Sequence, residues 1–507
     1  MHRYVGVTIG PIVDTIMDAS SPAALWFASS LFSDVARRIC SEVKNVFTDA
    51  VIYSPYFGTD IQIDDGIGKF HDRIIFATDQ CDSEKMKWLI TKVKRETAVC
   101  FPEKFVNPNA IAFLEKYIQI HYVILEEMEV IKSNGILALS PYLDVLELMR
   151  SFPEDDKDNV FRKLFQGEEE SGNLYIKKSS LFQKIKEDSN QLKKDKNGLW
   201  TVADIACDHG EMKEKLKRKN YYAVVQADGD NMGKFLENLN NKMVTEFSKA
   251  CLEYDKHACE RIGKFGGMTI YAGGDDLLFL APVLNSKGES VFDLCAEIGK
   301  QFHEHITNAE SFKNNSCIPT VSFGIALQHK KYPLYEALSR GRELLGLAKE
   351  NRKQKNSIAI EVLKHSGKSI KVIVPNEEHE VYQEILSLGD EEEKTVHSVI
   401  YTLQKFQKLI SILNLKMKKK EIDEDAYRYA FMNLFDNVEQ IPSVDYLKRV
   451  CDTYRKYFVI GDTKICVPKE EDADIPKKND ESLKAYLNLL LIKKFLLEKD
   501  EENETVS

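Results

Sequence analysis

The sequence predicts an α+β protein with several domains. One apolar, strand-like run, residues 222–227, is followed directly by acidic residues, and a second, residues 271–280, contains an acidic pair. Beyond Pro375 the apolar residues recur with helical spacing, most clearly over residues 394–413 and 482–497. With 507 residues and 43% hydrophobic content, the chain can bury more than one core. Its length is typical of three or four domains.

Four segments follow from these patterns. Residues 1–130 mix strands and helices, and residues 131–219 form a mostly helical linking segment rich in Glu and Lys. Residues 220–374 carry both acidic runs, and residues 375–507 are expected to be helical.

The first acidic motif is Asp-Gly-Asp at residues 228–230. It directly follows an apolar run, which predicts a strand that delivers carboxylates at its C-terminal end. Gly233 and Lys234 are expected to open the next helix.

The second acidic motif is Gly-Gly-Asp-Asp at residues 273–276, between two apolar runs. This pattern predicts a β-hairpin, because the glycines permit the positive φ that a tight turn needs. On such a turn Asp275 and Asp276 can face one divalent cation.

Together the two motifs indicate a metal site. Two carboxylate sets on separate strands are the minimum for two-metal phosphoryl transfer, and all-oxygen ligands favour Mg²⁺ or Mn²⁺. Each motif alone is more often an ordinary polar turn or loop. Their order, a strand with acids followed by a helix and then a hairpin with acids, favours catalysis.

The two motifs resemble the catalytic palm of the large subunit of type III CRISPR effector complexes of the Cmr type, a relative of the diguanylate cyclase palm. The resemblance extends to residues 320–326, 332–349 and 355–357, which match the following strand, helix and turn. It implies a catalytic, ferredoxin-like palm over residues 220–374.

The N-terminal segment resembles the first, non-catalytic palm of the same family, through residues 7–14, 25–33 and 68–76. Gly10-Pro11 stands where the second palm has Asp-Gly-Asp, so metal ligands are missing. The resemblance implies a degenerate ferredoxin-like domain that packs against the catalytic palm and helps to form the floor of a nucleotide pocket. It also implies a C-terminal helical domain that touches small subunits of the complex.

The resemblance assigns roles to individual residues. Asp228, Asp275 and Asp276 are the expected catalytic residues and metal ligands, and the backbone carbonyl of Gly229 is a further ligand. Lys349 is expected to contact nucleotide phosphates. The other expected nucleotide-binding residues are Asn231, Gly233, Lys234, Gly273, Gly274, Ser322 and Lys355.

Two features common in the family are absent from the sequence. The palm-like pattern starts at Val5, so we expect no preceding HD nuclease domain and no DNA cleavage, and His71-Asp72 has no partner His-Asp elements. The ten cysteines include no Cys-x-x-Cys pair, so we expect no zinc site. Cys207 and His209 could in principle bind a metal, but a structural zinc site needs four ligands.

Composition indicates a cytoplasmic protein without membrane segments. No apolar stretch reaches the roughly 20 residues needed to cross a bilayer, and no signal peptide is recognisable. The net charge of −10, from 70 basic and 80 acidic residues, does not favour nucleic-acid binding by the chain as a whole.

The chemistry we expect is nucleotidyl transfer from ATP. A 3′-hydroxyl would attack an α-phosphate and release pyrophosphate. The resemblance implies a second-messenger synthase in a complex with other subunits and CRISPR RNA, switched on when target RNA binds. Most relatives make cyclic oligoadenylates, whereas some Cmr-type members without the HD domain join ATP to S-adenosylmethionine, and both products stay open.

Two other functions remain in view. One is a catalytically inactive scaffold subunit of an RNA-binding complex. The other is a free-standing diguanylate-type cyclase, which would be expected to carry Glu-Phe after the two glycines, where this chain has Asp275-Asp276-Leu277.

Overall fold

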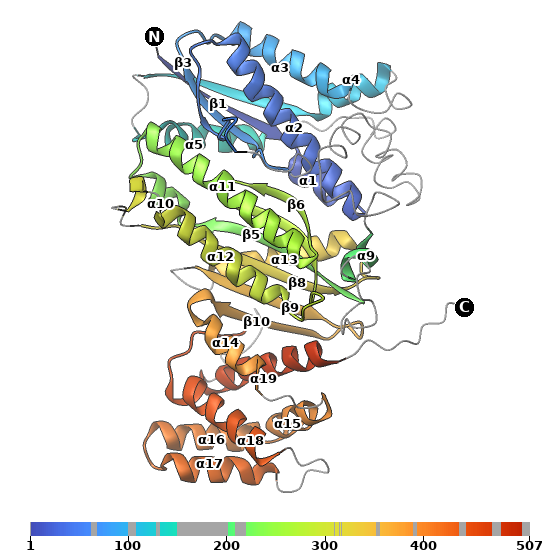
Figure 1. Cartoon of the computed structure of the whole chain (residues 1–507), viewed down its shortest axis with the longest axis vertical. Helices are drawn as coiled ribbons and strands as arrows, with labels where there is room; N and C mark the ends of the chain where they lie inside the picture. The colour runs from blue at the N-terminus through green and yellow to red at the C-terminus, as the bar shows by residue number, and fades with distance from the viewer. Residues whose placement is uncertain are drawn as a thin grey trace, which may run out of the picture.

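The computed structural model is elongated and places three regions one after another. Figure 1 shows an N-terminal α/β region at the top, a larger sheet with its helices in the middle, and a helical region at the bottom. The structure describes residues 2–61, 68–99, 108–127, 132–149, 201–207, 220–308, 310–313, 315, 317–350, 355–388, 393–435, 443–468 and 478–498.

The N-terminal region is a four-stranded antiparallel sheet in the order β2-β3-β1-β4. This is the strand order of a ferredoxin-like β-α-β-β-α-β unit. Ser21 and Asp82 cap its two long helices by accepting backbone hydrogen bonds. The elements are β1 (Arg3–Gly10), α1 (Ile12–Met17), α2 (Pro22–Val46), β2 (Val51–Ser54), β3 (Arg73–Thr78), α3 (Ser83–Ala98), α4 (Pro108–Tyr117) and β4 (Gln119–Glu126).

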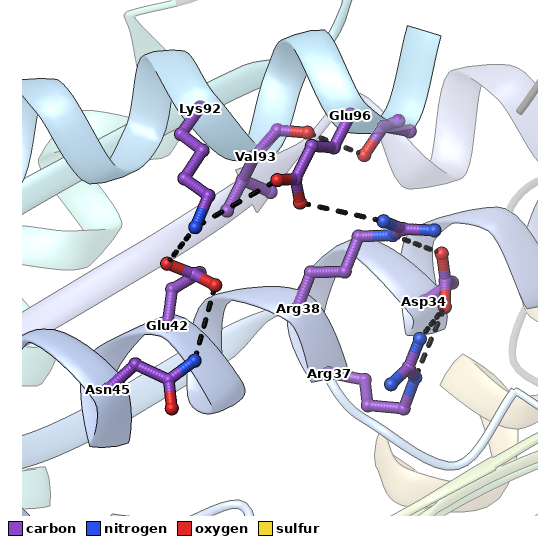
Figure 2. Close-up of polar contacts among 9 residues, drawn as sticks. Asp34, Arg37, Arg38, Glu42, Asn45, Lys92, Val93 and Glu96 are labelled. Carbon is purple, nitrogen blue, oxygen red and sulfur yellow. Dashed lines mark hydrogen bonds and ion pairs between the residues drawn. The ribbon is translucent and has the colours of Figure 1, made fainter. Parts of the chain in front are cut away.

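Charged side chains join α2 to α3 on the outside of this region (Figure 2). Asp34 accepts hydrogen bonds from Arg37 and Arg38, and Arg38 also lies 3.7 Å from Glu96 of α3. Burial opposes ionisation of Asp34, but the two arginines nevertheless lower its pKa. Such partly exposed pairs add little stability, so the network mainly fixes the orientation of the two helices.

The second sheet repeats and extends the first. Its six strands run in the order β10-β9-β8-β5-β7-β6, and only the β8–β9 pair is parallel. Four of them, β8-β5-β7-β6, reproduce the order β4-β1-β3-β2 of the first sheet, which confirms the prediction of two ferredoxin-like units. The elements are β5 (Tyr221–Asp230), α10 (Met232–Leu236), α11 (Asn241–Phe265), β6 (Met268–Gly273), β7 (Asp276–Pro282), α12 (Val291–Asn308), η4 (Glu310–Phe312), β8 (Thr320–His329), α13 (Leu334–Glu350), β9 (Ser357–Leu363) and β10 (Ser369–Pro375).

The two sheets share two buried cores, each of which contains residues of both sheets. Helices α11 and α12 cover one face of the second sheet, whereas α13 and the N-terminal helix α2 cover the other. The 68–72 segment extends this contact, because Gly68 forms a parallel bridge with Tyr271 and accepts a 2.9 Å hydrogen bond from the amide of Ala272. On the surface, Lys249 of α11 lies 2.6 Å from Asp60.

The C-terminal region is a helical bundle. The predicted helix over residues 394–413 is in fact two helices, α15 and α16, which meet at Phe406. The last helix is not amphipathic as expected, because α14, α15, α16 and β10 surround it and bury most of its apolar residues. The elements are η5 (Asn376–Glu378), α14 (His379–Leu386), α15 (Glu393–Lys405), α16 (Gln407–Lys418), α17 (Glu424–Met432), η6 (Asn433–Phe435), α18 (Val444–Thr453), a π-helical turn (Tyr454–Ile460) and α19 (Lys478–Leu497).

The linking segment, residues 131–219, lies mostly outside the described residues. Its described parts are α5 (Gly135–Leu148), which packs on the first sheet, and the short α9 (Val202–Ala206). Among the described residues, no helix combines the length and the apolar composition that crossing a membrane requires.

Candidate active site

The predicted acidic motifs lie on neighbouring strands of the second sheet. Asp228 and Gly229 are near the end of β5, and Asp275 and Asp276 belong to the β6–β7 hairpin, as the sequence predicted. The two motifs are in direct contact, because a Cβ atom added to Gly229 would lie 2.5 Å from Oδ2 of Asp275. A glycine at this position is therefore needed to let the carboxylate approach β5 so closely.

The hairpin turn is held from behind by a buried acid. Gly274 adopts a φ of 79°, which a glycine tolerates without strain. Its amide donates a 3.1 Å hydrogen bond to Oδ2 of Asp255, a residue of α11 that is 1% exposed. Burial raises the pKa of Asp255 well above its usual range, and the nearby carboxylate of Asp275 raises it further. Asp255 thus fixes the turn that presents Asp275 and Asp276.

The carboxylates at the hairpin resist full ionisation. Burial, together with the neighbouring Asp228, raises the pKa of Asp275 to about 6. The surrounding protein and the charges of Asp275, Asp228 and Asp72 raise the pKa of Asp276 well above its usual value, although this side chain still reaches solvent. Crowded carboxylates of this kind favour either protons or cations.

Lys349 supplies the positive charge that the structure places among them. It lies in the last turn of α13, and its Nζ donates a short hydrogen bond to Oδ2 of Asp228. The same Nζ donates a 2.9 Å hydrogen bond to the carbonyl oxygen of Gly229. Across the described part of the chain, no group of three or more His, Cys, Asp or Glu side chains is arranged to hold a metal ion.

Asp230, the second acid of the first motif, holds neighbouring strands together. It is fully buried, and its Oδ2 accepts hydrogen bonds from Thr320, Ser322 and the amide of Asn356, at 2.8–2.9 Å. Burial raises its pKa despite these donors. Ser322, expected to line the nucleotide pocket, is also fully buried, and its hydroxyl is committed to Asp230. These contacts tie β5 and β8 to the turn before β9.

The remaining predicted residues surround the carboxylates. Asn231 and Lys355 both have left-handed backbones, with φ of 59° and 55°. Asn231 precedes α10, on which Gly233 and Lys234 are exposed. A Cβ atom at Gly233 would meet nothing within 4 Å, so this side of the site is open.

The N-terminal region also reaches the site. Nε2 of His71 lies 2.9 Å from the Ser54 hydroxyl, and its ring approaches Gly274, with Cδ2 3.9 Å from an added Cβ atom. Burial lowers the pKa of His71 to about 4, so the ring is neutral at pH 7. Burial, reinforced by Glu147, raises the pKa of Asp72 to about 6.

Sequence reasoning missed the contributions of His71, Asp72 and Asp255. The first two lie about 200 residues before the hairpin, and no motif links them to it. The sequence contains only a weak indication for Asp255. It lies on the apolar face of a helix, between Cys251 and Ala258, where an acid is rarely buried unless it is paired.

A separate cavity of about 580 Å³ lies in the C-terminal bundle. Of its basic residues, Arg428 is paired with Asp452, and Arg455 with Glu424. None of the predicted site residues lines it.

Comparison with known proteins identifies the domain that carries this site. Residues 221–359 match the family model described as Cas10/Cmr2, second palm domain. The chain carries a Cas10/Cmr2 palm. The matched segment runs from the start of β5 into β9, so it contains Asp228, the hairpin and Lys349. The resemblance seen in the sequence is thereby confirmed.

Known relatives extend this likeness. A CRISPR system Cmr subunit, Cmr2 of Pyrococcus furiosus, is 29% identical over 217 residues, which are 37% of this chain and 23% of that protein. The chain thus matches about a quarter of the length of this curated relative. A type III-B Cmr-beta structure in the apo state aligns with a TM-score of 0.56, at 12% identity, over 98% of this chain and 82% of that one.

The same fold appears in two other solved structures. Cmr-beta bound to cognate target RNA aligns with a TM-score of 0.55, at 12% identity, over 98% of this chain and 83% of that one. A Csm1–Csm4 cassette in complex with pppApApA aligns with a TM-score of 0.51, at 13% identity, over 97% and 69%. At these identities the likeness is one of fold, and it covers both sheets and the helical bundle.

Proposed function

We propose that this chain transfers nucleotidyl groups from ATP, with Asp228, Asp275 and Asp276 as ligands for two Mg²⁺ or Mn²⁺ ions. The observation that carries the proposal is the contact between the two acidic motifs, with Asp275 packed on Gly229. The raised pKa values of Asp275 and Asp276 express an excess of negative charge that cations would relieve. Oxygen-only donors suit hard divalent ions.

The ions would neutralise the triphosphate and the leaving pyrophosphate. The chain's own residues then have separate tasks. Asp255 holds the hairpin in place through Gly274, and Lys349 offers an ammonium to the phosphates from the last turn of α13. The open side around Gly233 and Lys234 is where a nucleotide would enter.

The proposal extends to the assembly in which the chain works. The likeness to Cmr2 and to Cmr-beta supports a role as the large subunit of a type III CRISPR effector complex, with CRISPR RNA and target RNA reached through the other subunits. We place this complex in the cytoplasm. Target RNA would switch the palm on.

Two products fit a palm of this kind. One is a cyclic oligoadenylate, and the other is a conjugate of ATP with S-adenosylmethionine. They differ in the acceptor: a second adenosine nucleotide offers a 3′-hydroxyl, whereas the conjugate requires a pocket for a sulfonium amino acid. Mass analysis of the product distinguishes them directly.

The competing hypothesis is a scaffold subunit with an inactive palm. The close approach of Asp275 to Gly229 and the buried support from Asp255 argue against it, because a decayed site has no need for a carboxylate-bearing turn held in this way. A free-standing diguanylate-type cyclase is disfavoured by Asp275-Asp276-Leu277 at the hairpin.

The test uses the chain assembled with its partner subunits, CRISPR RNA and target RNA. Labelled ATP is supplied with Mg²⁺ or Mn²⁺, with and without S-adenosylmethionine, and products are resolved by mass. We expect an RNA-dependent nucleotide product with release of pyrophosphate. Absence of any product in an assembled, RNA-bound complex would favour the scaffold function.

A further inference from the structure

We propose that Lys349 is a tethered counter-ion: it fills the cation position of the nucleotide-free site and moves onto the triphosphate when metal and ATP arrive. The consequence is that a divalent ion and ATP bind cooperatively. This inference rests on the proposed function, because it assumes that Asp228 and Gly229 ligate the ion.

The first support is the identity of the two oxygen atoms that the ammonium of Lys349 contacts. The ammonium of Lys349 contacts Oδ2 of Asp228 and the carbonyl oxygen of Gly229. These are the two oxygens of β5 that the sequence assigns to the metal. A lysine ammonium has one positive charge and donates hydrogen bonds to the same hard oxygens that Mg²⁺ or Mn²⁺ would bind.

The second support is that the ion and the ammonium exclude each other. Both groups need direct contact with the same carboxylate oxygen, and two like charges at that distance repel strongly in a partly buried site. The side chain of Lys349 is only 18% exposed.

The third support concerns the acceptors that remain for the displaced ammonium. Its charge acts against burial to lower the pKa of Asp275, Asp276 and Asp230, and the first two are the proposed metal ligands. Oδ2 of Asp230 already accepts hydrogen bonds from Thr320, Ser322 and Asn356, whereas its buried Oδ1 has no hydrogen-bond partner among the described residues. A bound triphosphate offers several charged oxygens, and the flexible four-carbon stem of lysine allows the ammonium to follow it.

Cooperativity follows by linkage. A metal ion alone must displace Lys349 without compensation, so it binds weakly. ATP alone meets the carboxylates of Asp228 and Asp275 without a cation between them. When both bind, the ion takes the oxygens and the ammonium takes the phosphates, and each ligand therefore raises the affinity for the other by the same factor.

The experiment measures Mn²⁺ binding rather than product. Free Mn²⁺ is followed by electron paramagnetic resonance in the full-length protein, with and without α,β-methylene-ATP, for the wild type and Lys349→Met. Methionine keeps the length and apolar stem of lysine but removes its charge. The matched control is Lys264→Met, which removes an exposed charge from α11 of the same domain, at a residue without an assigned role in the site. Circular dichroism verifies that all three proteins are folded.

We expect Lys349→Met to bind Mn²⁺ without nucleotide at least about tenfold more tightly than the wild type, the size of losing one competing charge-assisted hydrogen bond. We also expect the enhancement of Mn²⁺ affinity by the nucleotide to shrink by a similar factor. Lys264→Met should leave both quantities within about twofold of the wild type.

Three results would overturn the inference. One is nucleotide-free Mn²⁺ affinity that is unchanged or weaker in Lys349→Met, and in Lys349→Gln if the methionine variant is unfolded. Another is an equal gain in Lys264→Met, which would indicate a general charge effect. The third, no Mn²⁺ binding in any variant even with nucleotide, would contradict the proposed function itself, whereas the first two leave that function standing.

Discussion

The two sheets of this chain have the same strand order but end their equivalent strands differently. In the second sheet β5 ends in Asp228-Gly229-Asp230, and Asp275 packs against Gly229. In the first sheet β1 ends at Gly10, where an added Cβ atom would meet nothing within 4 Å. The shared fold supplies the same strand end in both copies, and only the second copy places carboxylates at the end of its first strand.

The comparison also shows what the first copy brings to the candidate site. Asp72 directly precedes β3, just as Asp275 directly precedes β7, so both copies have an acid at the start of this strand. Asp72 is close enough to Asp276 to raise its pKa. The first domain therefore contributes charge to the candidate site, although its first strand carries no Asp-Gly-Asp.

The largest expected effect comes from removing the hairpin carboxylates of the second sheet. Replacing both Asp275 and Asp276 with Ala should reduce nucleotide product by at least ~100-fold, because the transferring group loses its electrostatic stabilisation. Assembly and thermal stability should be retained, since the substitutions relieve repulsion. Product is measured in the RNA-bound complex, with Asp14→Ala, an acid just after Gly10-Pro11, as the matched control. A double variant that works at near wild-type rate would remove the palm from catalysis.

The next effect concerns stability and pH. The pKa of Asp275 rises from 3.8 to about 6 on folding, so the folded protein binds this proton more tightly than the unfolded chain does. The ionised carboxylate therefore destabilises the metal-free protein progressively as pH rises through this interval. Asp275→Asn should be more stable than the wild type at pH 8, by up to about 3 kcal/mol.

This difference should disappear below pH 4, where the wild-type carboxyl is protonated in both states. Urea unfolding in EDTA at several pH values measures it. A constant difference across the whole range would mean that folding does not shift the pKa of Asp275, contrary to its surroundings.

A paired glycine experiment sharpens the contrast between the strand ends. Gly229→Ala should lower product by about tenfold or more, because the new methyl group would lie 2.5 Å from Oδ2 of Asp275 and displace the carboxylate. Gly10→Ala should have little effect, since its surroundings are open. Both rates are measured in the assembled complex. Equal effects of the two substitutions would show that close approach is not what distinguishes β5.

The smallest effect tests the support behind the hairpin. Asp255→Leu should lower product about five- to tenfold, because the Gly274 amide is left without its buried acceptor. Asp255→Asn keeps an acceptor oxygen and should recover most of the rate. Mn²⁺ affinity in the presence of nucleotide should fall in parallel with the rate. If the leucine variant loses stability but keeps its Mn²⁺ affinity, Asp255 supports only the fold.

Much of this arrangement was predictable, because its signals are local in sequence. Glycines next to acids mark the hairpin, and an apolar run before Asp228 marks the strand that faces it. Contacts between distant segments were not predictable. No periodicity links His71 to Gly274, and nothing in residues 320–326 shows that the hydroxyl of Ser322 turns inward to Asp230. The break at Phe406 lacked a signal as well, because the apolar spacing continues across it.

Helix α2 makes the chain unsuited to dissection into separate palms. Its apolar residues, including Trp26, belong to the same core as Ile270, Leu278 and Leu280 of the second sheet. A fragment that began at residue 220 would leave these three side chains facing water, although its motifs would be complete. The first copy thus forms half of a shared core, and fragments meant to isolate the chemistry of the second copy should begin before β1.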